Sequence, residues 1–434
     1  MKFLTFIYKK PVIIFFITVF SFLLLNSFYN LIQILLGAKH PKTSFFFYPN
    51  DMFADFFKTT LNYYNLSDFF KNTKQTYIAK YLYFEYHSQQ NTALPPFYNF
   101  IMGINAKLFK ILNPYIVYIL NILLFFTFFF FQIKNFIIKK RVVFVIFTTS
   151  LFSYAILFML NRGNIFSAFL CLILIQILIN FYKKENFFQN FFLVLIAFCG
   201  KPTALCFALY IFNYKISFLK KILYFFLLLI LSPFFFIIVN EMNFIFLEYI
   251  WSFYIDFEGT FKIYTNKTYY NDYIIGNNGL YFGSSLWGLI KVLLYILNKF
   301  FLINFNYYFF YLFTFIICSL IFFNFIILFL YKKINSVIFS FALTSFYILV
   351  SPVSSDYHLI IFFGPLLLIF KDYKIFNSKK LYIFLIFIIG FIISPQHYYI
   401  TEKFMPEKTA LNPLLIFLAN ILILIKTYFP RTKL

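Results

Sequence analysis

Long apolar runs separated by short clusters of lysine and arginine are the feature that most constrains what this chain can fold into. Only 12% of the 434 residues are charged, whereas a soluble domain carries about 25%. Lys and Arg favour the cytoplasmic ends of membrane helices. We therefore predict an all-α polytopic membrane protein whose basic clusters lie in the cytoplasm. These clusters are 9–10, 139–141, 183–184, 215 with 220–221, 332–333, 371–380 and 426–433.

The apolar runs predict one integral membrane domain over residues 1–434, a helix bundle of about 10 to 13 membrane segments with both termini inside. Several runs are too short for a straight crossing, so we expect broken or half-spanning helices, as at 188–200 and 202–214. The runs 95–112 and 286–304 contain lysines, which favours helices in the outer interface. The other runs are 11–36, 114–133, 142–160, 165–182, 222–240, 307–331, 336–350, 359–371, 381–394 and 410–427.

The charge and the cysteines exclude other classes of partner. A net charge of +23 is typical of nucleic-acid binding, but here the cations lie at helix ends, so membrane lipid is the expected partner and no nucleic acid is expected. All four cysteines fall inside apolar runs without metal-ligand spacing, so we expect no metal site. The abundance of Phe, Tyr, Ile, Asn and Lys is typical of an AT-rich bacterial genome, which predicts a bacterial plasma (inner) membrane.

Polar, non-basic segments all fall on the side opposite the basic clusters. They include a first outer loop at 38–94, a second outer loop at 241–285, and the short motifs 161–164, 200–202 and 351–358. Chance would scatter such segments over both faces. This distribution predicts an active site that faces the periplasm or exterior.

Asp51 and Asp55 lie one helical turn apart, directly after the first apolar run. The chain has only 14 acidic residues, and two at this spacing are typical of a catalytic carboxylate site. The alternative is that they solvate a loop or favour a helix N-terminus.

Arg162 and Lys201 are cations within or between apolar runs on the same side. Arg162 lies in Asn161-Arg162-Gly163-Asn164 and is costly at membrane depth unless it is paired or faces a polar cavity, so we predict a lipid-phosphate contact. The alternative is an arginine that reaches the interface. Lys201 precedes Pro202 in a broken helix, which favours a phosphate-binding or carboxylate-pairing role.

Two further polar motifs are less specific. Asn277-Asn278-Gly279 followed by Ser284-Ser285-Leu286-Trp287 is a turn that leads into an amphipathic helix. The segment from Ser351 to His358 could hold phosphate or sugar hydroxyls, or could simply break and cap helices.

The order of these motifs resembles the family 87 branch of the GT-C glycosyltransferases, the polyprenol-phosphate-mannose-dependent mannosyltransferase type. The resemblance spans about residues 45–365, although the spacing from Asp55 to Pro95 is longer than in the family pattern. It implies transfer of a mannose-like hexose from a polyprenyl-phosphate sugar to a glycan or glycolipid acceptor. Asp55, or else Asp51, would be the base. Arg162, Lys201 and His358 would neutralise the leaving phosphate without a metal or cofactor. Asn164, Asn278 and Ser285 would complete the substrate site.

Two other classes of membrane protein are compatible with the pattern. A lipid-linked polysaccharide polymerase or ligase would be expected to use arginines in large outer loops, whereas Arg162 is the only arginine away from the cytoplasmic clusters. A lipid or glycan transporter would be expected to show an internal repeat, and the two halves of the chain show no convincing similarity.

Overall fold

The structure is a computed structural model. It describes residues 10–36, 53, 55–56, 96–109, 111–137, 139–247, 274–275, 283–302, 305–351, 354, 356–372, 379–395 and 407–429. Asp51, Asn278 and most of the two outer loops lie outside these residues. Within the described part of the chain the elements are helices, and no strand is present.

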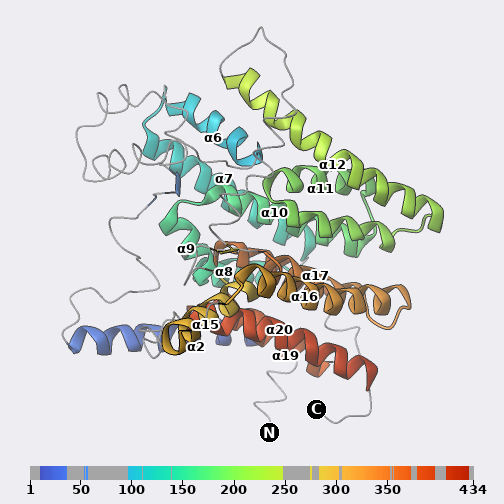
Figure 1. The fold of residues 1–434 in the computed structure, drawn as a ribbon. Helices are drawn as coiled ribbons and strands as arrows, with labels where there is room; N and C mark the ends of the chain where they lie inside the picture. Colours follow the sequence, from blue (N-terminus) through green and yellow to red (C-terminus); the bar gives the residue numbers. More distant parts are fainter. Residues whose placement is uncertain are drawn as a thin grey trace.

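The helices run roughly parallel and antiparallel to one another across the molecule (Figure 1). In chain order they are α2 (Pro11–Leu35), α6 (Pro96–Phe109), α7 (Pro114–Phe136), α8 (Lys140–Leu151), α9 (Tyr154–Arg162), α10 (Ile165–Lys183), α11 (Phe187–Gly200), η2 (Pro202–Asn213), α12 (Phe218–Leu247), α15 (Leu286–Phe301), α16 (Tyr307–Leu330), α17 (Ser336–Leu349), η3 (Asp356–Phe362), α18 (Phe363–Asp372), α19 (Lys379–Ile392) and α20 (Glu407–Tyr428), where η marks a 3-10 helix.

The prediction of an all-α polytopic membrane protein is confirmed. Six of the described helices are long and apolar enough to cross a membrane, namely α2, α7, α10, α16 and parts of α12 and α20. The pair α8 and α9 passes the same criteria as one span that bends by 52°. The outer helices expose many large apolar side chains, including Leu24, Phe128 and Leu320, as expected of surfaces that face lipid.

Helix breaks free backbone groups, and neighbouring elements bind some of them. At the bend between α8 and α9, the backbone N–H of Tyr154 donates to the carbonyl of Ile393 at 2.7 Å. Between α11 and η2, Pro202 contributes no N–H, and the N–H of Ala204 donates to the carbonyl of Lys201 at 2.8 Å. The broken helix expected around Gly200-Lys201-Pro202 is therefore present.

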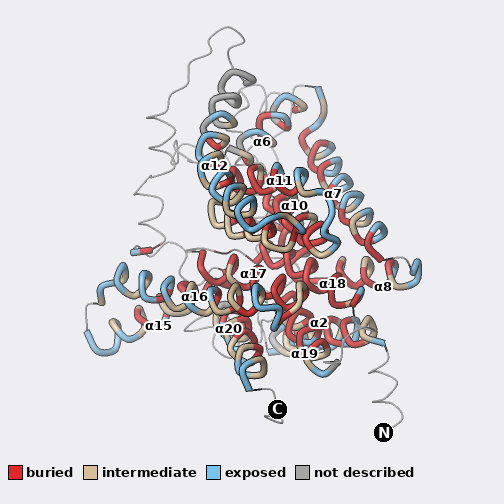
Figure 2. The backbone as a smooth tube through the Cα atoms, turned by 90° about the vertical axis from the view of Figure 1, so that its right-hand side faces the viewer, coloured by how far each residue is buried: buried red, intermediate tan, exposed pale blue. Residues whose placement is uncertain are grey.

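The core of the bundle is formed by α10, α17 and α18, which Figure 2 shows as almost continuously buried. Over the most apolar 18 residues of each helix, 78% are buried in α10 and 28% are buried in α2. A helix that is apolar on all sides and buried in this way lies at the centre of a bundle. Helices α9, α11 and η2 and the short η3 pack around it.

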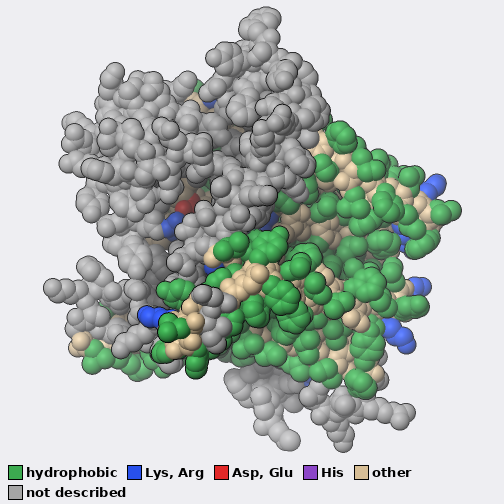
Figure 3. Space-filling model, viewed as in Figure 1, with side chains coloured by type: hydrophobic (Ala, Val, Ile, Leu, Met, Phe, Trp, Pro, Cys, Tyr) green, Lys and Arg blue, Asp and Glu red, His purple; other side chains and the backbone are tan. Residues whose placement is uncertain are grey.

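The basic clusters of the described residues lie together at one end of the bundle, here called the basic end. Lys183 lies over the ring of Phe136, with its nitrogen 5.9 Å from the centroid, and Lys371 donates to the Phe136 carbonyl at 3.5 Å. Asn213 donates to the Ser336 hydroxyl at 3.4 Å, which brings the loop after η2 to the start of α17. Figure 3 shows Lys and Arg side chains at the right-hand end of the molecule, beyond a largely apolar flank.

Two helices predicted to lie in the interface are present as short elements. Helix α6 has 14 residues and α15 has 16, both shorter than the roughly 20 that a straight crossing needs. Helix α6 packs against α11 and α12, and α15 packs against α16 and α20. Their placement relative to the membrane plane stays a prediction.

Candidate functional site

The turn between α9 and α10 supplies two of the predicted site residues. Arg162 is the last residue of α9, Gly163 adopts the left-handed conformation (φ 74°), and Asn164 caps α10. The side-chain oxygen of Asn164 accepts from the backbone N–H of Ser167 at 3.2 Å. Because this cap fixes the amide, its nitrogen is left to donate to a group above the turn.

Phe53, Asp55 and Phe56 lie directly on this turn. The backbone N–H of Phe53 donates to the carbonyl of Asn161 at 2.7 Å, and that of Phe56 donates to Phe53 at 3.1 Å. The Phe56 side chain is fully buried and stacks on Phe166, with centroids 5.9 Å apart and planes 8° apart. It also contacts Tyr118, with centroids 5.0 Å apart. Aromatic packing therefore anchors the segment that carries Asp55.

Gly163 permits this close approach. A Cβ atom at this position would lie 2.9 Å from the Cβ of Phe56 and 3.0 Å from the Cα of Phe53. The positive φ angle independently disfavours any residue with a Cβ. Gly163 is thus required both by its own conformation and by the backbone packed against it.

Asp55 is held through both of its carboxylate oxygens. One oxygen accepts from Nη2 of Arg162 at 2.7 Å, and the other accepts from the amide nitrogen of Asn164 at 3.1 Å. The side chains of Asp55 and Arg162 each remain 21% exposed. The carboxylate also lies beside the N-terminus of α10, where the helix dipole favours negative charge. These contacts stabilise the ionised form, which can accept a proton.

One face of α9 connects this ion pair to η3. Tyr154, Phe158 and Arg162 follow one another at intervals of four residues and so lie on one face. Phe158 stacks on Tyr357 with centroids 6.0 Å apart, and Arg162 lies one turn beyond Phe158 on α9. Tyr154 donates to the buried carboxylate of Asp356 at 3.2 Å.

Asp356 joins four elements. In addition to Tyr154 of α9, it accepts from the hydroxyl of Ser284 at 3.1 Å. Ser284 in turn accepts from the amide of Asn412 in α20 at 3.1 Å. The backbone N–H of Ser284 donates to the Ser354 carbonyl at 2.7 Å. This network fixes the start of η3, and with it the positions of the two residues that follow Asp356.

Lys201 and His358 both lie beside the ring of Tyr347. The Lys201 nitrogen lies 4.8 Å from the centroid of the Tyr347 ring, within the range of a cation–π contact. His358 is buried, and the centroid of its ring lies 6.3 Å from that of Tyr347 and 4.9 Å from that of Tyr357. Tyr357 therefore contacts both His358 of this group and Phe158 of α9.

A stripe on α10 runs beside both groups. Asn164 contacts Asp55, and Ser167 shares a hydrogen bond of 2.7 Å with the Tyr98 hydroxyl. The Cys171 sulfur lies 3.8 Å from the His358 carbonyl oxygen. These positions, at i, i+3 and i+7, share one face of the helix, so α10 aligns the two groups along one line.

The structure thus brings five predicted residues to the end of the bundle opposite the basic end. Asp55, Arg162 and Asn164 are in direct contact, while Lys201 and His358 are linked through Tyr347. Ser285 caps α15 by accepting from the N–H of Gly288 at 3.0 Å, so its substrate role stays a prediction. Asp51 and Asn278 lie outside the described residues. No group of three or more His, Cys, Asp or Glu suited to a metal ion occurs within the described part.

Sequence reasoning missed the aromatic members of the site. Phe56 is the anchor of the Asp55 segment, yet a chain with 76 phenylalanines offers no signal that marks one of them. Tyr347 and Tyr98 lie inside apolar helices, where they read as core residues. A polar hydroxyl within an otherwise apolar helix is the signal that could have identified them.

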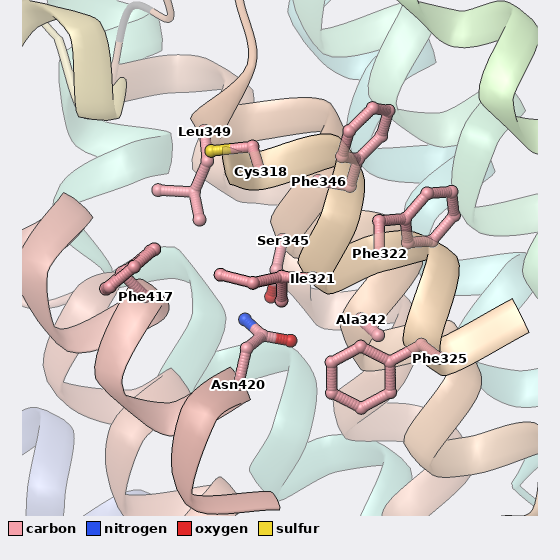
Figure 4. Close-up of a pocket in the computed structure, with 10 residues that line it drawn as sticks. All are labelled: Cys318, Ile321, Phe322, Phe325, Ala342, Ser345, Phe346, Leu349, Phe417 and Asn420. Atoms are coloured by element: carbon pink, nitrogen blue, oxygen red, sulfur yellow. The ribbon is translucent and has the colours of Figure 1, made fainter. Parts of the chain in front are cut away.

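A separate groove lies between α16, α17 and α20 (Figure 4). Its lining is mostly apolar. The hydroxyl of Ser345 donates to the Phe341 carbonyl at 2.8 Å, and the amide of Asn420 donates to the Ile416 carbonyl at 2.7 Å, each within its own helix. The groove therefore offers apolar contacts to a hydrocarbon chain rather than polar groups for catalysis.

No family model, curated protein or solved structure matched this chain. A proposal of function must therefore rest on the geometry and chemistry of the residues at the site.

Proposed function

We propose that this protein is a membrane glycosyltransferase that moves a sugar, a mannose-like hexose, from a polyprenyl-phosphate donor to a glycan or glycolipid acceptor. The observation that carries the proposal is the placement of Asp55. Its carboxylate accepts hydrogen bonds from Arg162 and Asn164 at the end of the bundle opposite the basic clusters. The contact between Asp55 and Arg162 thus combines a candidate base and a candidate phosphate-binding cation, and both side chains are partly exposed.

In the proposed reaction, the acceptor hydroxyl gives its proton to Asp55 while its oxygen attacks the anomeric carbon of the donor sugar. The bond between that carbon and the phosphate oxygen breaks, and polyprenyl phosphate leaves with the bonding electrons. General base catalysis of this kind contributes about 10²- to 10⁴-fold to a rate. The carboxylate must be ionised for this step, as its contacts favour.

The leaving phosphate carries negative charge that cationic donors would stabilise. Arg162 is suited to this role because a guanidinium has five N–H donors and can contact a carboxylate and a phosphate together. Lys201 and His358, linked through Tyr347, would supply further positive charge and hydrogen bonds. The donor is a co-substrate, and the proposed reaction needs no additional cofactor or metal.

The expected location follows from the charge distribution. Clusters of Lys and Arg favour the cytoplasmic face, so the opposite end would face the periplasm or exterior of a bacterial plasma membrane. A polyprenyl chain would then lie in the bilayer, with its phosphate and sugar at the surface where Asp55 and Arg162 lie.

The direct test is transfer in membranes that contain the full-length chain. Membranes with and without the protein would be incubated with radiolabelled polyprenyl-phosphate sugars and a lipid and glycan extract. We expect label in a new glycan or glycolipid only when the protein is present. Lengthening of a lipid-linked glycan without a polyprenyl-phosphate sugar would favour a polymerase, and protein-dependent movement of lipid across vesicles without transfer would favour a transporter.

A further inference from the structure

The hydroxyl of Tyr347 is a buried polar group that the helices around it leave unsatisfied. Tyr347 lies in α17 and has no exposed surface. Its hydroxyl has no hydrogen-bond partner within the described part of the chain. Most buried hydroxyls in proteins are paired, because an unpaired one loses its bonds to water without replacement. A missing hydrogen-bond acceptor at this position is therefore informative.

The surroundings of Tyr347 carry donors and positive charge. The Lys201 nitrogen lies 4.8 Å from the ring centroid, and the ring of His358 lies 6.3 Å away. The hydroxyl of Thr203, two residues beyond Lys201, likewise has no hydrogen-bond partner among the described residues. Thr203 is the second residue of η2, which begins at Pro202. The N-terminus of a helix favours an anion.

We infer that Tyr347 is a further substrate-contacting residue whose hydroxyl donates a hydrogen bond to a phosphate group. A phosphate oxygen would accept from this hydroxyl and place negative charge beside the Lys201 ammonium, whereas a neutral ligand would supply the hydrogen bond without the charge. The inference deepens the proposed function, on which its assignment of the phosphate to a polyprenyl donor rests. The phosphate itself could come from a lipid or from free phosphate, and the two sources can be separated by experiment.

We expect a ligand to reach the hydroxyl beside Lys201. Lys201 and Thr203 are partly exposed, whereas Tyr347 is fully buried. Lysine has a flexible four-carbon stem, so the Lys201 ammonium can move from the face of the Tyr347 ring to an incoming anion. Binding would then require a side-chain movement and no rearrangement of helices.

The test compares Tyr347→Phe with Tyr210→Phe in the full-length protein in detergent. Tyr347→Phe removes one hydroxyl and keeps the ring beneath Lys201. Tyr210 is equally buried, but its hydroxyl donates to the Phe187 carbonyl at 3.2 Å near the basic end. Thermal unfolding would be followed with farnesyl phosphate, farnesol or inorganic phosphate, and transfer would be assayed in parallel.

We expect Tyr347→Phe without ligand to unfold at the same or a higher temperature than the wild type, because an unsatisfied group has been removed. Its affinity for farnesyl phosphate should fall by about 10- to 100-fold, since a hydrogen bond to a charged group is lost. Farnesol should stabilise both proteins equally. Tyr210→Phe should unfold at a lower temperature and keep its affinity and its transfer activity.

The inference is overturned if Tyr347→Phe binds farnesyl phosphate as the wild type does, or if farnesol discriminates between them equally well. If that result came with active, Asp55-dependent transfer, the proposed function would stand without this contact. If the wild type transferred no sugar but Tyr347→Phe still weakened phosphate binding, the phosphate site would stand and the transferase proposal would fail. A response to inorganic phosphate as large as to farnesyl phosphate, and weakened in Tyr347→Phe, would support the contact and assign it to free phosphate.

Discussion

At the residue scale, the backbone of Gly163 determines where Asp55 can lie. The Phe53–Phe56 segment rests on the glycine so closely that its nearest atoms would be about 3 Å from an added Cβ. The segment is anchored on its other side by Phe56 in an aromatic pocket formed by Phe109, Tyr118 and Phe166. Asp55 therefore owes its position to packing as much as to its ion pair.

Gly163→Ala should displace this segment and separate Asp55 from Arg162. We expect sugar transfer to fall by about tenfold or more, because displacement by about 1 Å can cost a factor of 100 in rate. The left-handed conformation should add a stability loss of about 1–2 kcal/mol. Transfer rates and thermal unfolding of the purified protein would measure both effects.

Gly390→Ala is the matched control for this substitution. An added Cβ there would also meet an atom at 3.0 Å, but that atom belongs to the Thr18 side chain, and Gly390 lies within α19. This variant should keep its transfer activity. Equal activity in the two alanine variants would mean that the contact between Gly163 and the Phe53–Phe56 segment does not position the base.

At the element scale, the site is assembled where helices break or end. Arg162 ends α9, Asn164 caps α10, Lys201 separates α11 from η2, and Asp356 begins η3. At each break the helix ends, so polar groups take positions that a continuous helix would fill with apolar side chains. The hydrogen bonds of Asp356 to Tyr154 and Ser284 then hold α9, η3 and the start of α15 together.

Asp356→Asn should loosen this junction. Tyr154 donates to one carboxylate oxygen and Ser284 to the other, so the NH₂ group of an asparagine would face a hydroxyl donor in place of an acceptor, and a buried donor left unpaired costs about 1–3 kcal/mol. Hydrogen exchange should rise at the start of η3 and of α15 and stay unchanged in the basic-end half of α10. Unaltered exchange at both starts would show that the network does not hold these elements.

At the scale of the whole molecule, the bundle has two chemically different ends. Basic clusters gather at one end, while the site residues lie at the other. Cysteines introduced at Ile111 and Leu302, both strongly exposed near the site end, should react with a membrane-impermeant thiol reagent added to intact cells or spheroplasts. Cysteines at Asn186 and Lys333, exposed at the basic end, should react only after permeabilisation. Labelling of Asn186→Cys from outside would show that the orientation is the reverse of the one proposed.

Much of this architecture could be predicted from the sequence, because hydropathy and basic clusters report directly on membrane helices. The boundaries of α10 and α16 and the break at Lys201 follow from local composition. The contact of Asp55 with Arg162 could not be derived in this way, since it joins residues 107 positions apart. Such contacts depend on how helices pack, and short motifs predicted a shared side of the membrane but no partners. The environment of Tyr347 could not be predicted from the sequence for the same reason.

The measurement that tests the central claim most directly is the transfer rate of Asp55→Asn against that of Glu185→Gln. Both substitutions remove one carboxylate, at the site end and at an exposed position of the basic end respectively. With radiolabelled polyprenyl-phosphate sugar, we predict that Asp55→Asn loses transfer by about 100-fold or more while it stays folded and still binds the donor. Glu185→Gln should match the wild type. Full transfer by Asp55→Asn would contradict the account, because the proposed base could then be absent without consequence.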